Sequence, residues 1–316
     1  MKLLYRIAVI CFLACSISLL IYWILFEGLR KFEVHKTERF QHLLVDSAYH
    51  DILFLGSSKL HTGTNPRVID SICNVDSYNA GIEGANLFES YYMLKGYLEK
   101  HKPPEYIFLS LDLFSFDLSD KIFNYTIYLN YIDNKAIKTM LAENGHPTFA
   151  YKLFPFLMLS DLDDYSRGNA LKGFAGKTEI LPGDFQYKGF LSNTGLTITN
   201  DTSAFVKPVD TLKIDPKASV LLNEIILNCK ARNIRLVLLY CPEFKSGLQK
   251  AYVNSGQVFH FMDSTAKING ISFLRHDSLS ICTDATLFAN MGHLNRQGAD
   301  VYSRLLAKEI QKIRGQ

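Results

Sequence analysis

The sequence predicts an α/β protein in which a parallel β-sheet is flanked by helices in three layers, preceded by one transmembrane helix. Short, continuously apolar runs alternate with amphipathic stretches of helix length, which is typical of buried parallel strands and their crossover helices. The chain has 316 residues, of which 48% are hydrophobic and 21% charged, so it can bury a sizeable core. Near the N-terminus, residues 7–26 contain no charged side chain.

Residues 7–26 form the predicted membrane-spanning segment. At a rise of about 1.5 Å per residue, a helix of this length crosses the roughly 30 Å hydrocarbon core of a bilayer. Lys2 and Arg6 precede the segment, and Arg30 and Lys31 follow it, so the positive-inside rule does not set the orientation. A short tail is easier to retain in the cytoplasm than a large domain. We therefore expect a single-pass membrane protein whose domain is extracytoplasmic, either periplasmic or extracellular.

A cleaved signal peptide is the alternative to an uncleaved signal anchor. Signal peptides have an apolar core of about 7–15 residues followed by small residues at the cleavage site. This run is longer and ends in Tyr22-Trp23-Ile24-Leu25-Phe26, whose bulky side chains make a poor cleavage site. Cys15 resembles a lipoprotein cysteine, but Phe12 does not suit that motif and the apolar run continues beyond it. The length and flanks favour the anchor.

The chain after the membrane segment is predicted to form one domain. The whole chain is thus predicted to consist of a tail (1–6), the membrane helix (7–26), a connector (27–48), and an α/β domain (49–316) with a large insertion at about 114–208. The insertion is rich in Tyr, Phe, Asn and Asp and lacks the strand–helix alternation of the rest. We expect it to shape a cleft or lid and not to be an independent domain.

The first half of the α/β domain begins with the apolar run 50–56, a strand that stops at a glycine. Residues 75–78 form a second short strand. Asn86 is a good N-cap for a helix over 86–101, which two prolines end. Residues 105–111 form a strand of the buried parallel type.

The second half continues the alternation. A short helix over 131–141 lies in the insertion. Beyond the insertion, apolar runs and helical spacing predict a helix over 216–233, a strand over 234–240, a helix over 250–268, a strand over 271–274 and a closing helix over 295–313. In such sheets ligands bind beyond the carboxyl ends of the strands, so functional residues should directly follow strands.

Three segments at such places carry candidate chemistry. Ser58 follows the first strand in Gly56-Ser57-Ser58, where a serine either is exposed at the sheet edge or caps the next helix. The segment 79–86 contains Gly81 and Gly84, whose backbone N–H groups either stabilise an oxyanion or only form a tight turn. His293 precedes the last helix, where it either reaches the sheet edge or is an ordinary structural histidine.

Together these segments resemble the SGNH, or GDSL-like, hydrolase superfamily. Gly56-Ser57-Ser58 is similar to its first block (Gly-Asp-Ser), and Gly84 and His293 match its second and last blocks. The string His293-Leu294-Asn295, with Gly298-Ala299, is similar to the ending of many bacterial envelope members, including membrane-anchored proteins linked to surface-polymer acylation. The resemblance covers about residues 50–112 and 215–312, and it implies a flavodoxin-like sheet.

The resemblance implies roles for these residues. Ser58 would be the nucleophile and His293 its base, with the N–H groups of Ser58 and Gly84 forming the oxyanion hole. At the end of the second strand, Asn79 and Gly81 are expected to bind substrate. The expected partners are acylated carbohydrate or another envelope polymer, and membrane proteins involved in modifying that polymer.

Two departures from the family pattern bear on activity. The last block is usually Asp-x-x-His, but Asn290 stands at the Asp position, so we expect Asn290, or Asp284 or Asp277 on the same loop, to orient His293. An asparagine cannot neutralise the imidazolium that forms during attack. The third block usually supplies an asparagine donor, whereas this chain has Asp112 followed by Leu, Phe and Ser.

Two functional hypotheses remain open. The first is a membrane-anchored extracytoplasmic serine esterase or O-acyltransferase acting on acyl esters of cell-envelope carbohydrate or polymer. The alternative is a weakly active or inactive relative that binds or positions such a polymer or a partner. We expect no cofactor and no metal site, since no motif with metal-ligand spacing occurs. The net charge of +3 does not suggest nucleic-acid binding. The cysteines in the domain either stay as buried thiols or form one disulfide.

Overall fold

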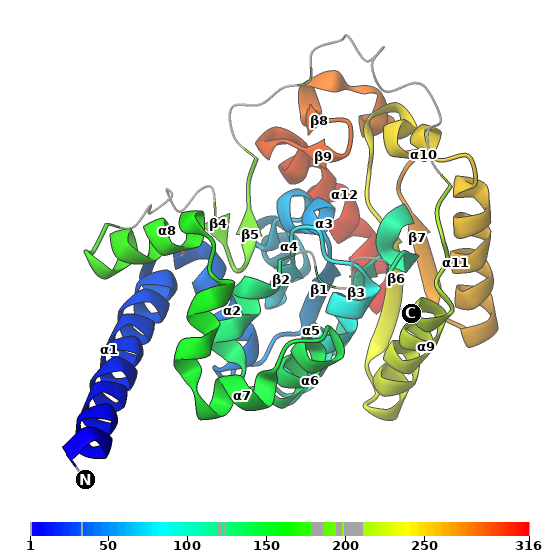
Figure 1. Ribbon diagram of the computed structural model, residues 1–316. Helices are drawn as coiled ribbons and strands as arrows, with labels where there is room; N and C mark the ends of the chain where they lie inside the picture. The colour runs from blue at the N-terminus through cyan, green and yellow to red at the C-terminus, as the bar shows by residue number, and fades with distance from the viewer. Residues whose placement is uncertain are drawn as a thin grey trace. The chain divides into compact units, whose positions relative to one another are not determined.

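A computed structural model describes residues 2–32, 34–118, 122, 124–177, 186–193, 198 and 211–315 (Figure 1). The chain divides into two compact units. Unit 1 comprises Met1–Val45 and Asn124–Ile180, and unit 2 comprises Asp46–Phe123 and Leu181–Gln316.

The core of unit 2 is a parallel sheet of five strands. Its order is β2 (Ser77–Gly81), β1 (Ile52–Gly56), β3 (Tyr106–Ser110), β6 (Arg235–Tyr240) and β7 (Ser272–Arg275). Each neighbouring pair is parallel, for example Leu53 beside Tyr78 and Ile107. This is the 2-1-3-4-5 order of flavodoxin-like sheets. The predicted fold class is therefore confirmed, and the second strand lies slightly later in the chain than predicted.

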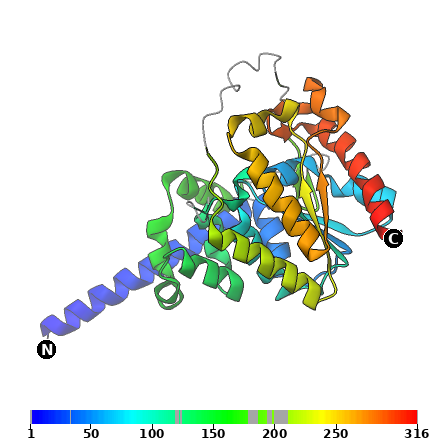
Figure 2. The same ribbon diagram turned by 90° about the vertical axis from the view of Figure 1, so that its right-hand side faces the viewer.

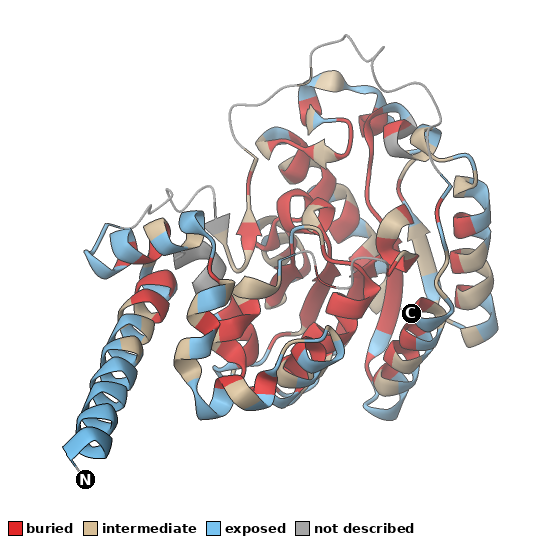
Figure 3. Ribbon diagram, viewed as in Figure 1, coloured by how far each residue is buried: buried red, intermediate tan, exposed pale blue. Residues whose placement is uncertain are grey.

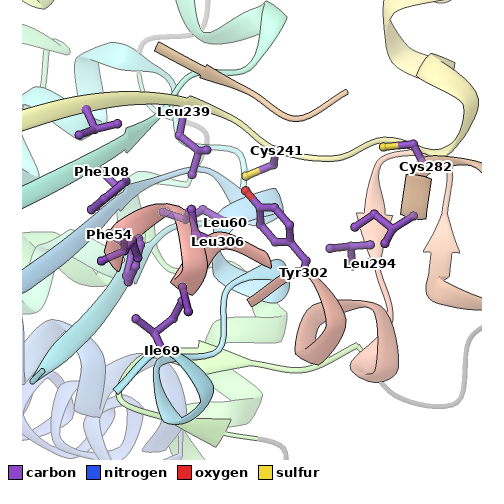
Figure 4. Packing of buried hydrophobic residues seen from close by; sticks show 14 of the residues in the cluster. Phe54, Leu60, Ile69, Phe108, Leu239, Cys241, Cys282, Leu294, Tyr302 and Leu306 are labelled. Atoms are coloured by element: carbon purple, nitrogen blue, oxygen red, sulfur yellow. The ribbon is translucent and has the colours of Figure 1, made fainter. Parts of the chain in front are cut away.

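Helices cover both faces of this sheet. On one face α4 (Pro66–Cys73) and α12 (Arg296–Arg314) pack against alternate strand residues. Figure 4 shows Phe54, Phe108 and Leu239 from three adjacent strands beside Ile69 and Leu306 of these helices. The helices α5 (Leu87–Leu98), α9 (Pro216–Ala231) and α11 (Ser255–Asn269) pack on β1, β6 and β7, and Figure 2 shows α9 and α11 in front of the sheet.

Short elements connect these layers. They are α3 (Ser58–Gly63), η1 (Leu113–Phe116), the antiparallel pair β4 (Gln186–Tyr187) and β5 (Phe190–Leu191), η5 (Phe244–Ser246), α10 (Gly247–Ala251), η6 (Ser280–Thr283), η7 (Ala285–Leu287), and the antiparallel pair β8 (Phe288–Asn290) and β9 (His293–Leu294). Two of them, α3 and the β8–β9 hairpin, carry the candidate catalytic side chains.

Unit 1 is entirely helical in the part of the chain that the structure describes. Its elements are α1 (Lys2–Phe32), α2 (Val34–Leu44), η2 (Tyr125–Tyr131), α6 (Lys135–Glu143), α7 (Thr148–Leu153), η3 (Pro155–Asp161) and α8 (Asp164–Phe174). Helix α1 is long and apolar enough to cross a membrane, and most of it is exposed (Figure 3). It extends beyond residues 7–26 at both ends, so much of the predicted tail and part of the connector are helical.

The C-terminal end of α1 packs closely on α8. A Cβ atom on Gly28 would lie 1.9 Å from the carbonyl oxygen of Ala170, and one on Gly173 would lie 2.1 Å from that of Gly28. The two backbones therefore touch at glycine positions. Residues 124–180, which lie within the predicted insertion, group with the N-terminal helices in unit 1. The predicted domain boundaries stay a prediction. That the insertion shapes a cleft or lid stays a prediction.

Candidate active site

The turn after β1 determines how Ser58 is presented. Gly56 has a φ of +155°, and a Cβ atom there would lie 2.8 Å from the Cβ of Ser110, so a side chain would be strained and crowded. The chain then enters α3, where the side chain of Ser57 is the N-cap and accepts from the N–H of Lys59. Because Ser57 fills the capping role, the hydroxyl of Ser58 is available for other chemistry.

Ser58 and His293 lie within hydrogen-bonding distance although 235 positions separate them in the chain. The distance from Ser58 Oγ to His293 Nε2 is 2.9 Å. His293 begins β9, and the tight turn of the β8–β9 hairpin brings its ring to the start of α3. The structure thus brings together the predicted nucleophile and base.

Asn290 occupies the other side of the imidazole. Its Oδ1 lies 2.9 Å from His293 Nδ1 and accepts from the backbone N–H groups of Gly292 and His293, both at 3.0 Å. Backbone N–H groups only donate, so this atom of the amide is the oxygen. His293 Nδ1 must then carry the proton, which leaves a lone pair on Nε2 facing Ser58 Oγ.

The electrostatics of the site favour a neutral His293. Burial lowers the pKa of His293 below its ordinary value, and the positive charge of Lys59 lowers it further. The carboxylates of Asp112, Glu83 and Glu243 act in the opposite direction without reversing the shift. A neutral imidazole is the form that accepts a proton from a serine.

A buried charge network lies directly beside the nucleophile. Lys59 Nζ sits 2.9 Å from Asp112 Oδ1 and forms a second ion pair with Glu243. Ser57 donates its hydroxyl hydrogen to Asp112, and Tyr240 donates to Glu243. All five side chains are buried. Burial alone would lower the pKa of Lys59, but the carboxylates hold it well above its ordinary value, so the ammonium stays charged.

Sequence reasoning missed Lys59 and Glu243 and treated Asp112 only as a departure from the family pattern. The available signal was a lysine next to the predicted nucleophile at a strand end that should be buried. A lysine there needs a carboxylate partner, because buried charges are paired. The sequence does not say which carboxylate.

The backbone N–H groups of Ser58 and Gly84 are the predicted oxyanion donors. Ser58 is the first residue of α3, so its N–H has no acceptor within the helix. Gly84 has a φ of +70°, which glycine adopts readily. Among the described residues, neither N–H has a hydrogen-bond acceptor. That these two groups form the oxyanion hole stays a prediction.

The structure does not support a substrate-binding role for Asn79 and Gly81. Asn79 is fully buried; its Nδ2 donates to the carbonyls of Leu60 (2.9 Å) and Thr64 (2.7 Å), and its Oδ1 accepts from Gly81 N. A Cβ atom on Gly81 would lie 2.6 Å from the backbone N of His61. These two residues hold α3 against β2, and no polar atom of the Asn79 side chain is left for a substrate.

Asp284 and Asp277 do not take the third position of the triad. Asp284 accepts from the N–H of Thr286 (2.9 Å) and from its hydroxyl (2.6 Å), which caps η7. Asp277 pairs with Arg275. The contact with His293 Nδ1 belongs to Asn290.

The remaining groups that could bind a metal or form a disulfide are the acidic, histidine and cysteine side chains. Within the described ranges, no cluster of three or more His, Cys, Asp or Glu side chains has the arrangement of a metal site. The domain cysteines Cys73, Cys229, Cys241 and Cys282 are buried free thiols, so the disulfide alternative is not realised in this structure.

Comparison with known proteins finds matches among solved structures. No protein-family model and no curated protein matches the chain. Among solved structures, a protein assigned to the lipolytic G-D-S-L family from Desulfitobacterium hafniense DCB-2 is similar at a TM-score of 0.40 and 9% identity. The match covers 81% of this chain and 97% of that one. The lipase/acylhydrolase from Enterococcus faecalis is similar at a TM-score of 0.37 and 10% identity, over 85% and 96% of the two chains.

Proposed function

We propose that this protein is a membrane-anchored serine hydrolase, an esterase or O-acyltransferase, that acts on acyl esters of cell-envelope carbohydrate or polymer. One observation carries the proposal. Ser58 Oγ, His293 and Asn290 Oδ1 form a continuous hydrogen-bonded chain with 2.9 Å at each step. This is the arrangement of a nucleophile, a base and the group that orients the base.

The geometry supports a two-step acyl transfer. His293 Nε2 takes the proton of Ser58 Oγ as that oxygen attacks the acyl carbonyl, and the N–H groups of Ser58 and Gly84 stabilise the resulting oxyanion. Collapse of this intermediate breaks the ester bond, and His293 protonates the departing alkoxide. Water or a sugar hydroxyl then attacks the acyl-enzyme, gives its proton to His293, and releases Ser58 with its proton restored. Hydrolysis and transfer share the first step.

Asn290 limits the efficiency of this mechanism. Its amide oxygen fixes the ring orientation and tautomer of His293, as an aspartate would. It carries no negative charge to stabilise the imidazolium. We therefore propose a slower enzyme than one with a full Ser-His-Asp triad.

Helix α1 supports the proposed anchoring. Leu25, Phe26, Gly28 and Leu29 are buried, whereas most of the preceding residues are exposed. The same helix thus combines a free apolar stretch with an end that packs into unit 1. Cleavage after the apolar stretch would interrupt this helix, and this favours the uncleaved anchor. We also propose that the domain faces away from the cytoplasm.

The test is covalent labelling of the full chain in lipid nanodiscs with a fluorophosphonate. We expect labelling at Ser58 by peptide mapping, and its loss in Ser58→Ala and His293→Ala. The exposed Ser278, replaced in Ser278→Ala, is the matched control and should label normally. A folded protein that does not label, or labels elsewhere, contradicts the proposal. Substrate classes would then be compared with acetylated glycans as probes.

A second candidate function is a binding protein that keeps this site without turnover. It is favoured by Asn290 and by the lack of an amide side chain after β3, where Asp112 is engaged by Lys59. It predicts that an acylated glycan binds equally well to the native chain and to Ser58→Ala, with no Ser58-dependent release of acid.

A further inference from the structure

An exposed apolar segment runs from the end of α7 into η3 in unit 1. Residues 153–159 read Leu-Phe-Pro-Phe-Leu-Met-Leu, seven residues without a polar side chain. Of these, only Met158 is buried, while Leu153 is 57% and Phe154 52% exposed. Phe149 of α7, at 72% exposed, adds to the same stretch of chain. Exposed apolar side chains grouped along one stretch of chain are typical of an interaction site.

Helix α8 also carries exposed apolar side chains. Leu171 and Phe174 are exposed on the helix that packs against α1, and Tyr165 is exposed near its start. The 3-10 helix η3 also packs on α1. Both segments that carry exposed hydrocarbon therefore lie against the predicted membrane helix itself.

Aromatic and basic contacts show the level on α1 at which α8 is attached. The rings of Trp23 and Phe174 meet edge to face at 5.7 Å. Lys31 Nζ lies 6.0 Å from the Phe174 ring, and Lys172 Nζ lies 5.6 Å from the Phe32 ring. Tryptophan and basic residues concentrate where a membrane helix leaves the hydrocarbon. The end of α8 is attached at this interfacial level.

We infer that α7, η3 and α8 form an interfacial membrane-binding surface, in which Phe154 and Leu171 enter the headgroup region of the bilayer that α1 spans. The inference rests on the proposed anchoring by α1 and goes beyond it, since a single anchor needs no second contact. We call residues 149–174 the interfacial segment. The molecule that this segment contacts is the lipid of the bilayer surface.

Two features favour lipid over a protein occupant. The segment is continuous with α1 through direct packing, so inserting α1 brings the segment to the membrane surface. Lys31 and Lys172 stand beside the apolar side chains, which is the pattern of interfacial segments on anionic lipid. An interfacial segment also restrains unit 1 against rotation about a lone helix.

Tryptophan fluorescence tests the inference, because the chain has a single tryptophan, Trp23. The full chain is reconstituted in nanodiscs of phosphatidylcholine and phosphatidylglycerol with or without acyl-chain bromine. In a Trp23→Phe background, Phe154→Trp and Leu171→Trp place the probe on the segment. Ile268→Trp, at a site in unit 2 that is 84% exposed, is the matched control. Fluorophosphonate labelling and far-UV circular dichroism check that each variant is folded.

We expect brominated lipid to quench probes 154 and 171 to an extent approaching that of native Trp23, and iodide to quench them less than probe 268. Strong iodide quenching without bromine quenching would place the segment in water and overturn the inference. Protection from both quenchers would indicate a protein occupant and overturn it as well. If Trp23 itself escapes bromine quenching, the anchoring fails and the inference fails with it; if Trp23 is quenched and the segment is not, only the inference fails.

Discussion

The two units of this protein depart from the usual distribution of side chains in opposite ways. Unit 2 buries a lysine and two carboxylates beside the end of β1, whereas unit 1 exposes a run of phenylalanine and leucine. Buried charge costs stability unless it is paired, and grouped apolar side chains exposed to water favour association unless something covers them. In unit 2 the compensation is a set of ion pairs within the protein. In unit 1 we propose that lipid outside the protein covers the apolar side chains.

The largest expected effect tests whether ion pairs in unit 2 offset the cost of burying Lys59. Lys59→Met leaves Asp112 and Glu243 buried without their cation, and breaking such a pair costs about 3–5 kcal/mol of unfolding free energy. We expect a matching drop in the denaturation midpoint of the full chain in detergent. Lys267→Met is the control, because Lys267 pairs with Asp263 on an exposed helix surface, where such pairs contribute about 0–1 kcal/mol. Equal losses in the two variants would show that the Lys59 network is not specially stabilising.

The next effect tests how unit 1 is held together. Gly173→Ala places a Cβ atom 2.1 Å from the Gly28 carbonyl oxygen, so α8 must move away from α1. Such overpacking costs about 1–3 kcal/mol, and hydrogen exchange in α8 should accelerate. Gly168→Ala is the control on the same helix, where an added Cβ meets nothing within 4 Å. It should slow exchange, since alanine favours a helix by roughly 0.5–1 kcal/mol. Faster exchange in both variants would show that the stability of α8 does not depend on its packing against α1.

The strands of unit 2 were predictable because each is a continuous apolar run of the length that a covered parallel sheet needs. Ser58 was predictable because it follows the first strand, and His293 because it precedes the last helix. Lys59 and Glu243 are 184 positions apart, and no local pattern joins them. Likewise, Asn290 and Asp284 lie on one loop with suitable side chains, and only the hairpin geometry selects Asn290.

Unit 1 was harder to predict for a different reason. Its association depends on glycines, which give no hydrophobic period, so the contact between Gly28 and Gly173 leaves no trace in the pattern. Its exposed aromatics look like core residues in a sequence. Asn79 was misassigned for the opposite reason. As a polar residue at a strand end it was expected to face substrate, but it is buried and hydrogen-bonds to α3.

A smaller effect tests whether the site of unit 2 lacks a charge. Asn290→Asp keeps an acceptor oxygen for His293 Nδ1 and adds the charge that stabilises the imidazolium. In a serine protease the reverse change costs about 10⁴ in turnover, largely through the wrong tautomer. Here the tautomer is already correct, so we expect a gain of only about tenfold in the rate of fluorophosphonate labelling, equivalent to roughly 1.4 kcal/mol. Ser58→Ala/Asn290→Asp should not label at all. An unchanged rate in the single variant would mean that nearby charges already fill the role.

The smallest effect is the position of the acid limb in the pH dependence of labelling. Burial lowers the pKa of His293, and the neutral imidazole is the active base, so labelling should persist below the ordinary histidine value of about 6.5 and fall only as the pH drops through the lowered pKa. In Asn290→Asp the new carboxylate favours the imidazolium, so the limb should move to higher pH. A native limb above 6.5 would mean that the buried carboxylates Asp112 and Glu243 outweigh both burial and Lys59 at His293. The network of unit 2 would then supply the counter-charge that Asn290 lacks, and Asn290→Asp should have little effect on the rate.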